Sequence, residues 1–384
     1  MHRLRELLTR LRASPRALGA LAVVAVLVAA AALDVPGRLG ALAPSDTPTA
    51  TPSTPTPAAT TAPRALLAPT DGDNAQLDRC TPGSAVLAQC GPAPELGRGT
   101  WVNSPRLGLD DLRGSVVLVD FFSGSCLACQ RDLKYVKAWQ ASYADAGLRV
   151  VGVHSPRFEF EQSAAQLRRT LDDLSITFPV MEDDASATLA SYRSDQVPSA
   201  YLIDRTGTVR AITLGEGGPF RIEGQIRKLL VEDRSDITLP EPVRVTDVQE
   251  TVPGTTTQID LVDARGARYD QETDTVTQDG TRFRLPPTQP DGTFSFGGPW
   301  TFEGRTAVPG AGAQTRVGFR ATTAFQLVGG RGALTITRSD GTERRIAVDG
   351  VPNLYALYAS DTFGAETLTV RYEGDLQVYA FSFG

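Results

Sequence analysis

Four cysteines are the residues of this chain best suited to chemistry. Cys126 and Cys129 stand in the segment CLAC, directly after the apolar run SVVLVDFF and at the start of a predicted helix that ends near Tyr143. Two cysteines three positions apart on a first helical turn can form a disulfide, and a helix N-terminus stabilises the thiolate of the first. We therefore predict that Cys126 attacks substrate disulfides and that Cys129, the more buried of the two, resolves the mixed disulfide.

A Cys-x-x-Cys pair also occurs in zinc sites and in structural bridges. The chain has no second pair of this kind and only two histidines, and His2 lies in the N-terminal tail. A structural zinc site needs four nitrogen or sulfur ligands, so zinc is the weaker interpretation. We expect no metal and no cofactor beyond the Cys126–Cys129 disulfide, and a purely structural disulfide remains the alternative.

Two further positions fit a thiol site. Asp120 lies six residues before Cys126 within the apolar strand, where a buried carboxyl group could take the proton of Cys129; an acid exposed at the strand end is the alternative. Val197 and Pro198 precede the strand SAYLID, and proline is unusual at a strand entry. A cis peptide bond there would leave the Val197 backbone free to pair with a substrate strand, and an ordinary trans loop proline is the alternative.

Two polar residues are candidates for substrate contact. Ser125 directly precedes Cys126, and His154 ends the predicted strand LRVVGVHS. The carboxyl ends of strands line the ligand crevice in open α/β sheets, so His154 could contact substrate or modulate a thiol. A polar strand-end residue without such a role is the alternative for His154. Glu159 and Glu161, at the start of the next helix, are expected to be solvated.

Cys80 and Cys90 precede the Cys-x-x-Cys segment and flank a Pro82-Gly83 turn. Their spacing matches no thiol-exchange motif. We predict a structural disulfide that pins the N-terminal extension of the domain. A shuttle pair that exchanges with Cys126–Cys129 is the functional alternative.

The elements around the cysteine pair alternate between strands and helices. Strands are predicted at SVVLVDFF, LRVVGVHS, FPVMED, SAYLID and TVRAITLG, with helices at FEFEQSAAQLRRTLDDL, ASATLASYR and PFRIEGQIRKLL. This alternation predicts an α/β domain over residues 71–232, with helices on both faces of a central mixed sheet. A connector over residues 233–257 follows. Short alternating segments over residues 258–384 predict an antiparallel β-sandwich, with Asp340-Gly341 in a hairpin turn.

The first seventy residues have the composition of a membrane tether. Residues 1–16 form a basic tail, residues 17–33 are apolar and uncharged, and residues 34–70 are rich in proline and threonine. A run of this length suits either a short spanning helix or a signal segment, and the basic tail places the N-terminus in the cytoplasm. The rest of the chain is then outside the cytoplasm, anchored to the cell membrane by one pass or secreted if the segment is cleaved. A disordered stalk is expected over residues 34–70.

Composition narrows the function further. The 384 residues are 41% hydrophobic and 21% charged, which is typical of a globular protein, and carry a net charge of −6. A nucleic-acid-binding protein would show a basic footprint, so no nucleic acid is expected as partner. Disulfides persist outside the cytoplasm, which agrees with the use of all four cysteines proposed above.

Together, Asp120, Cys126-x-x-Cys129 and Val197-Pro198 resemble the acid, the redox pair and the cis-proline of the thioredoxin fold. The extra βα segment over residues 149–176 resembles the extracytoplasmic TlpA/ResA-type branch. The segments GPAPEL, TWVNSP, VVGVHSP, WTFEGRTA and LQVYAFSFG resemble the soluble part of DipZ-type proteins of actinobacteria. This resemblance implies a thiol–disulfide oxidoreductase acting on extracytoplasmic protein thiols and disulfides, with a C-terminal carbohydrate-binding-like β domain.

The chain also departs from these families. DipZ-type proteins carry a multi-span electron-transferring domain ahead of the redox domain, so a reductase here would need a separate membrane electron-transfer protein. Leu127-Ala128 lacks the histidine that strong oxidants carry between the cysteines, which favours a reductase slightly over an oxidase. Val119 and Ser123 stand where a peroxiredoxin has proline and threonine, which argues against peroxidase activity.

A second hypothesis makes the C-terminal domain the working part. Trp300, Tyr355 and Tyr358 are the aromatic candidates for stacking on a glycan of the cell envelope, and a place in the core is the alternative for each. The protein would then be a glycan- or protein-binding module whose thioredoxin-like domain is a non-catalytic scaffold. The complete set of Asp120, Cys126, Cys129 and Pro198 argues for the enzyme.

Overall fold

The computed structural model describes residues 74–232, 234, 236–246, 248, 251–263, 267–269, 272–277 and 280–384. The predicted basic tail, apolar segment and proline-rich linker lie outside these residues. Among the helices that are described, none is long and apolar enough to cross a membrane.

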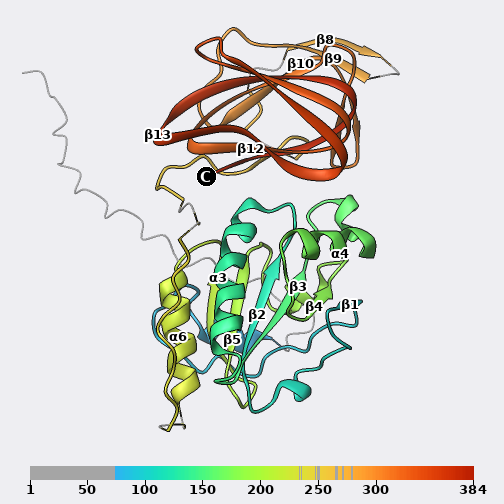
Figure 1. Ribbon diagram of the computed structural model, residues 1–384. Helices are drawn as coiled ribbons and strands as arrows, with labels where there is room; N and C mark the ends of the chain where they lie inside the picture. The colour runs from blue at the N-terminus through green and yellow to red at the C-terminus, as the bar shows by residue number, and fades with distance from the viewer. Residues whose placement is uncertain are drawn as a thin grey trace, which may run out of the picture. The chain divides into compact units, whose positions relative to one another are not determined.

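A six-stranded mixed sheet forms the first domain, with the strand order β1-β4-β3-β2-β5-β6 (Figure 1). The strands are β1 (Trp101–Val102), β2 (Val116–Phe122), β3 (Leu148–His154), β4 (Val180–Glu182), β5 (Ser199–Ile203) and β6 (Val209–Leu214). β2 lies in the middle, parallel to β3 and antiparallel to β5. All seven of its residues are buried, as expected for an apolar strand covered on both faces.

Helices cover both faces of this sheet. They are α3 (Leu127–Tyr143), α4 (Ala164–Asp173), α5 (Ala187–Ser191) and α6 (Pro219–Val231), with short 3₁₀ turns η2 (Ala75–Arg79), η3 (Asp110–Leu112) and η4 (Glu159–Gln162). Side chains of α3, α4 and α6 share one core with Val116, Leu118 and Phe122 of β2. Val117, Val119 and Phe121, which alternate with them, belong to the core on the other face. The two cores follow directly from the period of two along a strand.

The segment after α6 packs against the first domain. The side chains of Leu239, Val243, Val245 and Val248 lie against the core that contains α3 and α6. The backbone N–H of Val243 also donates to the carboxylate of Glu223 in α6, at 2.7 Å. The predicted connector is therefore held along α6 at these positions.

The second domain is all antiparallel β-structure. Its strands are β7 (Ile259–Asp260), β8 (Glu272–Thr277), β9 (Gly280–Arg284), β10 (Thr293–Glu303), β11 (Thr306–Pro309), β12 (Gln314–Arg338) and β13 (Glu343–Phe383). They pair in the order β11-β13-β12-β10-β9-β8, and β11 also pairs with β10. This extra pairing closes the sheet into a barrel-like form. The predicted fold class, an α/β thioredoxin-like domain followed by an all-β antiparallel domain, is confirmed; the second domain, predicted as a β-sandwich, is one sheet closed on itself.

The long strands β12 and β13 join through the predicted hairpin (Figure 1). Leu334 pairs with Ile346 and Thr337 with Glu343, so Asp340-Gly341 lies in the turn. Gly341 has a φ of +83°, a conformation that glycine adopts without strain. Aromatic side chains fill the core of this domain; they include Phe294, Phe296, Trp300, Phe319 and Phe381.

Candidate functional site

The Cys126–Cys129 pair lies at the N-terminus of α3, where β2 turns into the helix. Cys126 is the N-cap residue, and its sulfur accepts the backbone N–H of Cys129 at 3.1 Å. The two cysteines form a disulfide, with side chains 4% and 0% exposed. The predicted order of burial is confirmed, because Cys126 keeps the little exposure that the pair has. A donor N–H and a helix N-terminus beside one sulfur both favour its thiolate form.

Val197 and Pro198 face this disulfide from the start of β5. The peptide bond between them is cis, as predicted, and the Val197 carbonyl oxygen lies 3.9 Å from the Cys126 sulfur. Cys126, Ala128 and Val197 are among the residues that line one groove at the surface. A substrate thiol or disulfide that enters this groove meets Cys126 before Cys129.

Asp120 lies in β2 on the face that carries the Cys126–Cys129 core. Its side chain is 3% exposed, which confirms the predicted burial. Desolvation by this burial raises the pKa of the Asp120 carboxyl to about 7. Asp120 lines a narrow cavity together with Pro198. A carboxyl with such a pKa can accept and release a proton near neutral pH.

A second acid, Asp132 in α3, lines the same cavity and was not among the predicted site residues. Burial raises its pKa to about 8, with further increases from the charges of Asp120 and Glu216, while Arg131 and the N–H of Gly217 act against the rise. Asp132 also lines a pocket that opens to solvent beside Phe220. Its position three residues after Cys129 places it on the same helix face, which is a signal that the sequence did contain.

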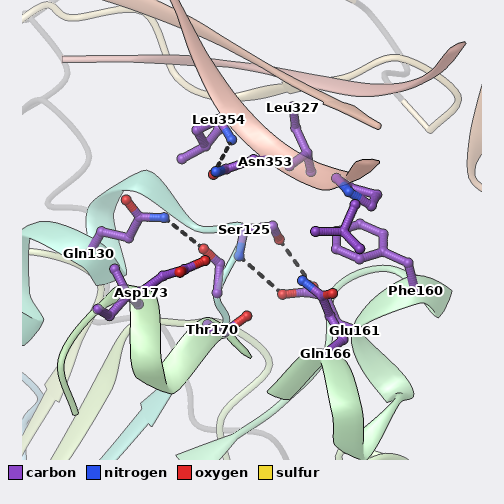
Figure 2. A pocket seen from close by; sticks show the side chains of 14 residues that line it. Ser125, Gln130, Phe160, Glu161, Gln166, Thr170, Asp173, Leu327, Asn353 and Leu354 are labelled. Atoms are coloured by element: carbon purple, nitrogen blue, oxygen red, sulfur yellow. Dashed lines mark hydrogen bonds between the residues drawn. The ribbon is translucent and has the colours of Figure 1, made fainter. Parts of the chain in front are cut away.

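The loop before Cys126 is held from below by Glu161, and Figure 2 shows this contact. Glu161 accepts hydrogen bonds from the Ser125 N–H at 3.0 Å, the Ser125 hydroxyl at 3.0 Å and the Ser123 hydroxyl at 2.7 Å. Its side chain belongs to η4 and is 2% exposed. The expectation that Glu161 is solvated is therefore wrong, because its carboxylate accepts hydrogen bonds from the loop and not from solvent.

Two predicted substrate contacts are corrected by the same arrangement. The Ser125 hydroxyl is directed at Glu161 and its side chain is buried. His154 is 1% exposed; its ring packs edge-on against Phe122, and its Nε2 lies 3.7 Å from the Glu161 carboxylate. His154 is enclosed and accepts the Gly124 N–H at 3.4 Å, so it supports the loop, while the buried Ser125 keeps only the small surface with which it lines the pocket of Figure 2.

Cys80 and Cys90 form the predicted second disulfide. Their side chains belong to the core on the face of the sheet that carries Val117, Val119 and Phe121. Cys126 and Cys129 belong to the core on the opposite face. The sheet thus separates the two disulfides, which favours the structural interpretation of Cys80–Cys90 over an exchange between the pairs.

The aromatic candidates for glycan binding lie in or against the core of the β domain. Trp300 is 1% exposed within β10, and its ring N–H donates to the Gly297 carbonyl at 3.1 Å. Of the two interpretations of Trp300, the place in the core is confirmed, and the ring is enclosed there and cannot stack on a sugar. Tyr355 and Tyr358 are partly buried and pack against the same core. A glycan contact by these two tyrosines stays a prediction.

The fold and the site together define a class. The cysteine pair at a helix N-terminus, the buried acid beneath it and the cis-proline beside it make the first domain a thioredoxin-like dithiol–disulfide domain. Two family models agree with this division: the AhpC/TSA family matches residues 99–212, and a thioredoxin like C-terminal domain matches residues 261–384.

Similar proteins narrow the class to a family. Thiol-disulfide oxidoreductase YkuV of Bacillus subtilis (strain 168) is 30% identical over 142 residues, which are 37% of this chain and 95% of that protein. The chain therefore belongs to the thioredoxin-like thiol–disulfide oxidoreductases. Protein DipZ of Mycobacterium tuberculosis (strain CDC 1551 / Oshkosh) is 35% identical over 329 residues, 82% of this chain and 46% of DipZ. The resemblance to DipZ-type proteins is confirmed, and the chain spans about half the length of these curated relatives.

Among solved structures, a thiol-disulfide isomerase from Corynebacterium glutamicum is 29% identical to this chain. The alignment covers 36% of this chain and 96% of that one, with a TM-score of 0.32.

Proposed function

We propose that this protein exchanges thiols and disulfides of extracytoplasmic proteins through Cys126 and Cys129, and that it works as a reductase. The observation that carries the proposal is the position of the Cys126 sulfur. It lies at a helix N-terminus with an N–H donor, beside the Val197 carbonyl and at the mouth of a groove. A nucleophilic thiolate needs these surroundings, and a closed structural disulfide does not.

The reaction proceeds in two exchanges. The Cys126 thiolate attacks one sulfur of a substrate disulfide, which forms a mixed disulfide and releases the first substrate thiolate. Cys129 then loses its proton and attacks the Cys126 sulfur, which releases the second substrate thiolate and leaves the Cys126–Cys129 disulfide. Two electrons pass from the dithiol to the substrate.

Asp120 and Asp132 handle the protons in this proposal. Asp120 accepts the proton of Cys129 during the second exchange, because its raised pKa keeps it poised near neutral pH. Asp132 lines both the internal cavity of Asp120 and the pocket that opens to solvent, so the proton can leave along it.

The proposal also includes the direction of the reaction and the attachment of the chain to the membrane. Leu127 and Ala128 provide no cation between the cysteines to stabilise the Cys126 thiolate further, which keeps the dithiol reducing. A separate membrane electron-transfer protein then regenerates the dithiol. Residues 17–33 anchor the chain in the cell membrane, and retention of the protein in membranes washed at alkaline pH tests this.

Insulin-disulfide reduction by the purified full chain, with dithiothreitol as electron source, tests the activity. The wild-type chain is expected to accelerate precipitation of the insulin B chain, and Cys126→Ser to lose the acceleration. Equal rates for the two proteins would contradict the proposal. The wild-type reduction potential decides direction: about −250 mV or lower supports a reductase, and about −120 to −180 mV an oxidase or isomerase.

A further inference from the structure

Glu161 is a buried acid whose carboxylate accepts hydrogen bonds from the loop that leads into Cys126. Its side chain is 2% exposed, although it belongs to a short 3₁₀ turn of the kind that normally displays its acids to solvent. Burial of a carboxylate costs several kcal/mol unless hydrogen bonds replace the lost water. The surroundings of Glu161 must therefore supply those bonds.

Five hydrogen bonds do so. Three come from the loop, namely the Ser123 hydroxyl, the Ser125 hydroxyl and the Ser125 N–H. Two come from the turn of Glu161 itself, where the N–H groups of Arg157 and Phe158 donate at 2.8 and 3.2 Å. The two serine hydroxyls also lie 3.0 Å apart and bond to each other. One carboxylate thus ties the residues directly before Cys126 to the turn after β3.

The same contacts keep Glu161 charged. Burial would raise its pKa, but the hydrogen bond and charge of His154, with the bonds from Ser123 and Arg157, lower it to about 2. His154 of β3 lies close by, with its Nε2 3.7 Å from the Glu161 carboxylate and accepting the Gly124 N–H at 3.4 Å. Glu182 on β4 pairs in register with His154. The ionised Glu161 carboxylate therefore lies beneath the loop, hydrogen-bonded to the residue that directly precedes the nucleophilic cysteine.

Charge near a dithiol changes its redox balance. A buried anion disfavours a nearby thiolate, which opposes the effect of the α3 N-terminus on Cys126. When the thiolate is less stable, the disulfide is favoured and the dithiol reduces its partners more strongly. The charge is effective here because the site is screened from water by burial.

We propose that Glu161 is a positioning residue that holds residues 123–125 under Cys126 and, through its buried negative charge, keeps the Cys126–Cys129 dithiol strongly reducing. The inference rests on the proposed function, since it concerns the balance of that same pair. In this proposal Glu161 acts through the loop and through its charge.

The test compares Glu161→Gln with Glu159→Gln in the full chain. Both substitutions remove one negative charge from the same turn, but Glu159 is exposed and Glu161 is buried. Equilibration with glutathione should show Glu161→Gln about tenfold more in the dithiol form than wild type, which is about 30 mV. The pH midpoint of Cys126 alkylation by iodoacetamide should also fall in this variant, and Glu159→Gln should match wild type in both measurements.

Glu161→Asp distinguishes the effect of the negative charge from the effect of the side-chain length. It also provides a second variant if Glu161→Gln does not fold. This variant keeps the charge but shortens the side chain, so it should retain the wild-type potential while it loosens the loop and slows insulin reduction. A folded Glu161→Gln with the wild-type potential and alkylation midpoint would overturn the inference, and so would a Glu161→Asp potential about 30 mV above wild type. A wild-type protein that reduces no insulin would instead overturn the proposed function.

Discussion

Asp120 and Asp132 line one narrow cavity, and the charge of Asp120 acts on the titration of Asp132. Burial is the first cause of the raised pKa of both groups, and the charge of Asp120 adds to the rise at Asp132. Two acids this close release their protons in steps that belong to the pair. The pair can therefore store one proton near neutral pH, where the proposed thiol–disulfide exchange has to move one.

The raised pKa of Asp120 should make the folded protein less stable as the pH rises. The unfolded carboxyl ionises near its ordinary pKa of 3.8 and the folded one near 7, so stability is lost over that range and is fully present below it. The difference corresponds to about 4 kcal/mol. In urea unfolding of the oxidised protein, Asp120→Asn should exceed wild type by roughly this amount at pH 8 and match it at pH 3.5. A constant difference at both pH values would show that ionisation is not the cause.

At the scale of single residues, prediction from sequence succeeded where a motif sets the position. Cys126, Cys129, Asp120 and Pro198 lie where their spacing placed them. Glu161, Ser125 and His154 were misjudged, because their burial depends on how η4 folds back under the loop. No periodicity along the chain records such a contact, since it joins segments that are 36 residues apart.

At the scale of elements, the central sheet separates the Cys126–Cys129 disulfide from the Cys80–Cys90 disulfide. Cys126–Cys129 belongs to the core with α3 and α6, and Cys80–Cys90 belongs to the core on the other face. The second disulfide closes a loop with a sequence separation of 10 between its cysteines. It therefore restricts the unfolded N-terminal extension without touching the site.

Removal of the second disulfide should cost stability and leave the redox chemistry unchanged. Closing a loop of this length stabilises by about 2.5–3 kcal/mol on the chain-entropy model. The double variant Cys80→Ala/Cys90→Ala should lose about that much free energy of unfolding in urea, with the Cys126–Cys129 potential of wild type. A shifted potential, or co-reduction of the two pairs in thiol trapping, would instead favour a shuttle.

The order of strands and helices was predictable because each element is long and strongly patterned. The run VVLVDFF became β2, and the hairpin around Asp340-Gly341 joined β12 to β13. The closure of the β domain was not predictable. It depends on β11 pairing with both β10 and β13, and such a register is set by contacts between distant strands.

At the scale of the whole molecule, the cysteines and the aromatic core of the β domain belong to different domains. All cysteines lie in the first domain, and the second has an aromatic core of its own. Trp300 is at the centre of that core, in ring contact with Phe296 and Tyr372. Because the Trp300 ring is buried, we expect it to stabilise the β domain and not to bind a ligand.

Trp300→Ala should therefore lower the stability of the β domain by about 3–5 kcal/mol, as for other large buried aromatic residues. Insulin reduction below the unfolding temperature should keep the wild-type rate, because the substitution is confined to the second core. Thermal unfolding followed by circular dichroism in the β-sheet region and the insulin assay measure the two effects, since Trp101 and Trp139 lie in the first domain and give no fluorescence signal for the second. A folded Trp300→Ala protein with slow insulin reduction would show that the β domain takes part in the reaction.

The pairing of the last strand has a consequence for synthesis on the ribosome. Phe383 pairs with Ala324 and Leu376 with Gly330, so the β domain cannot close before β13 has been translated. The first domain has its strands and helices complete once Val231 has emerged. Domains made first generally fold first. The first domain can thus be folded while the barrel-like sheet still lacks its last strand, so a chain cut within β13 would keep the cysteine pair in a folded domain beside an open sheet.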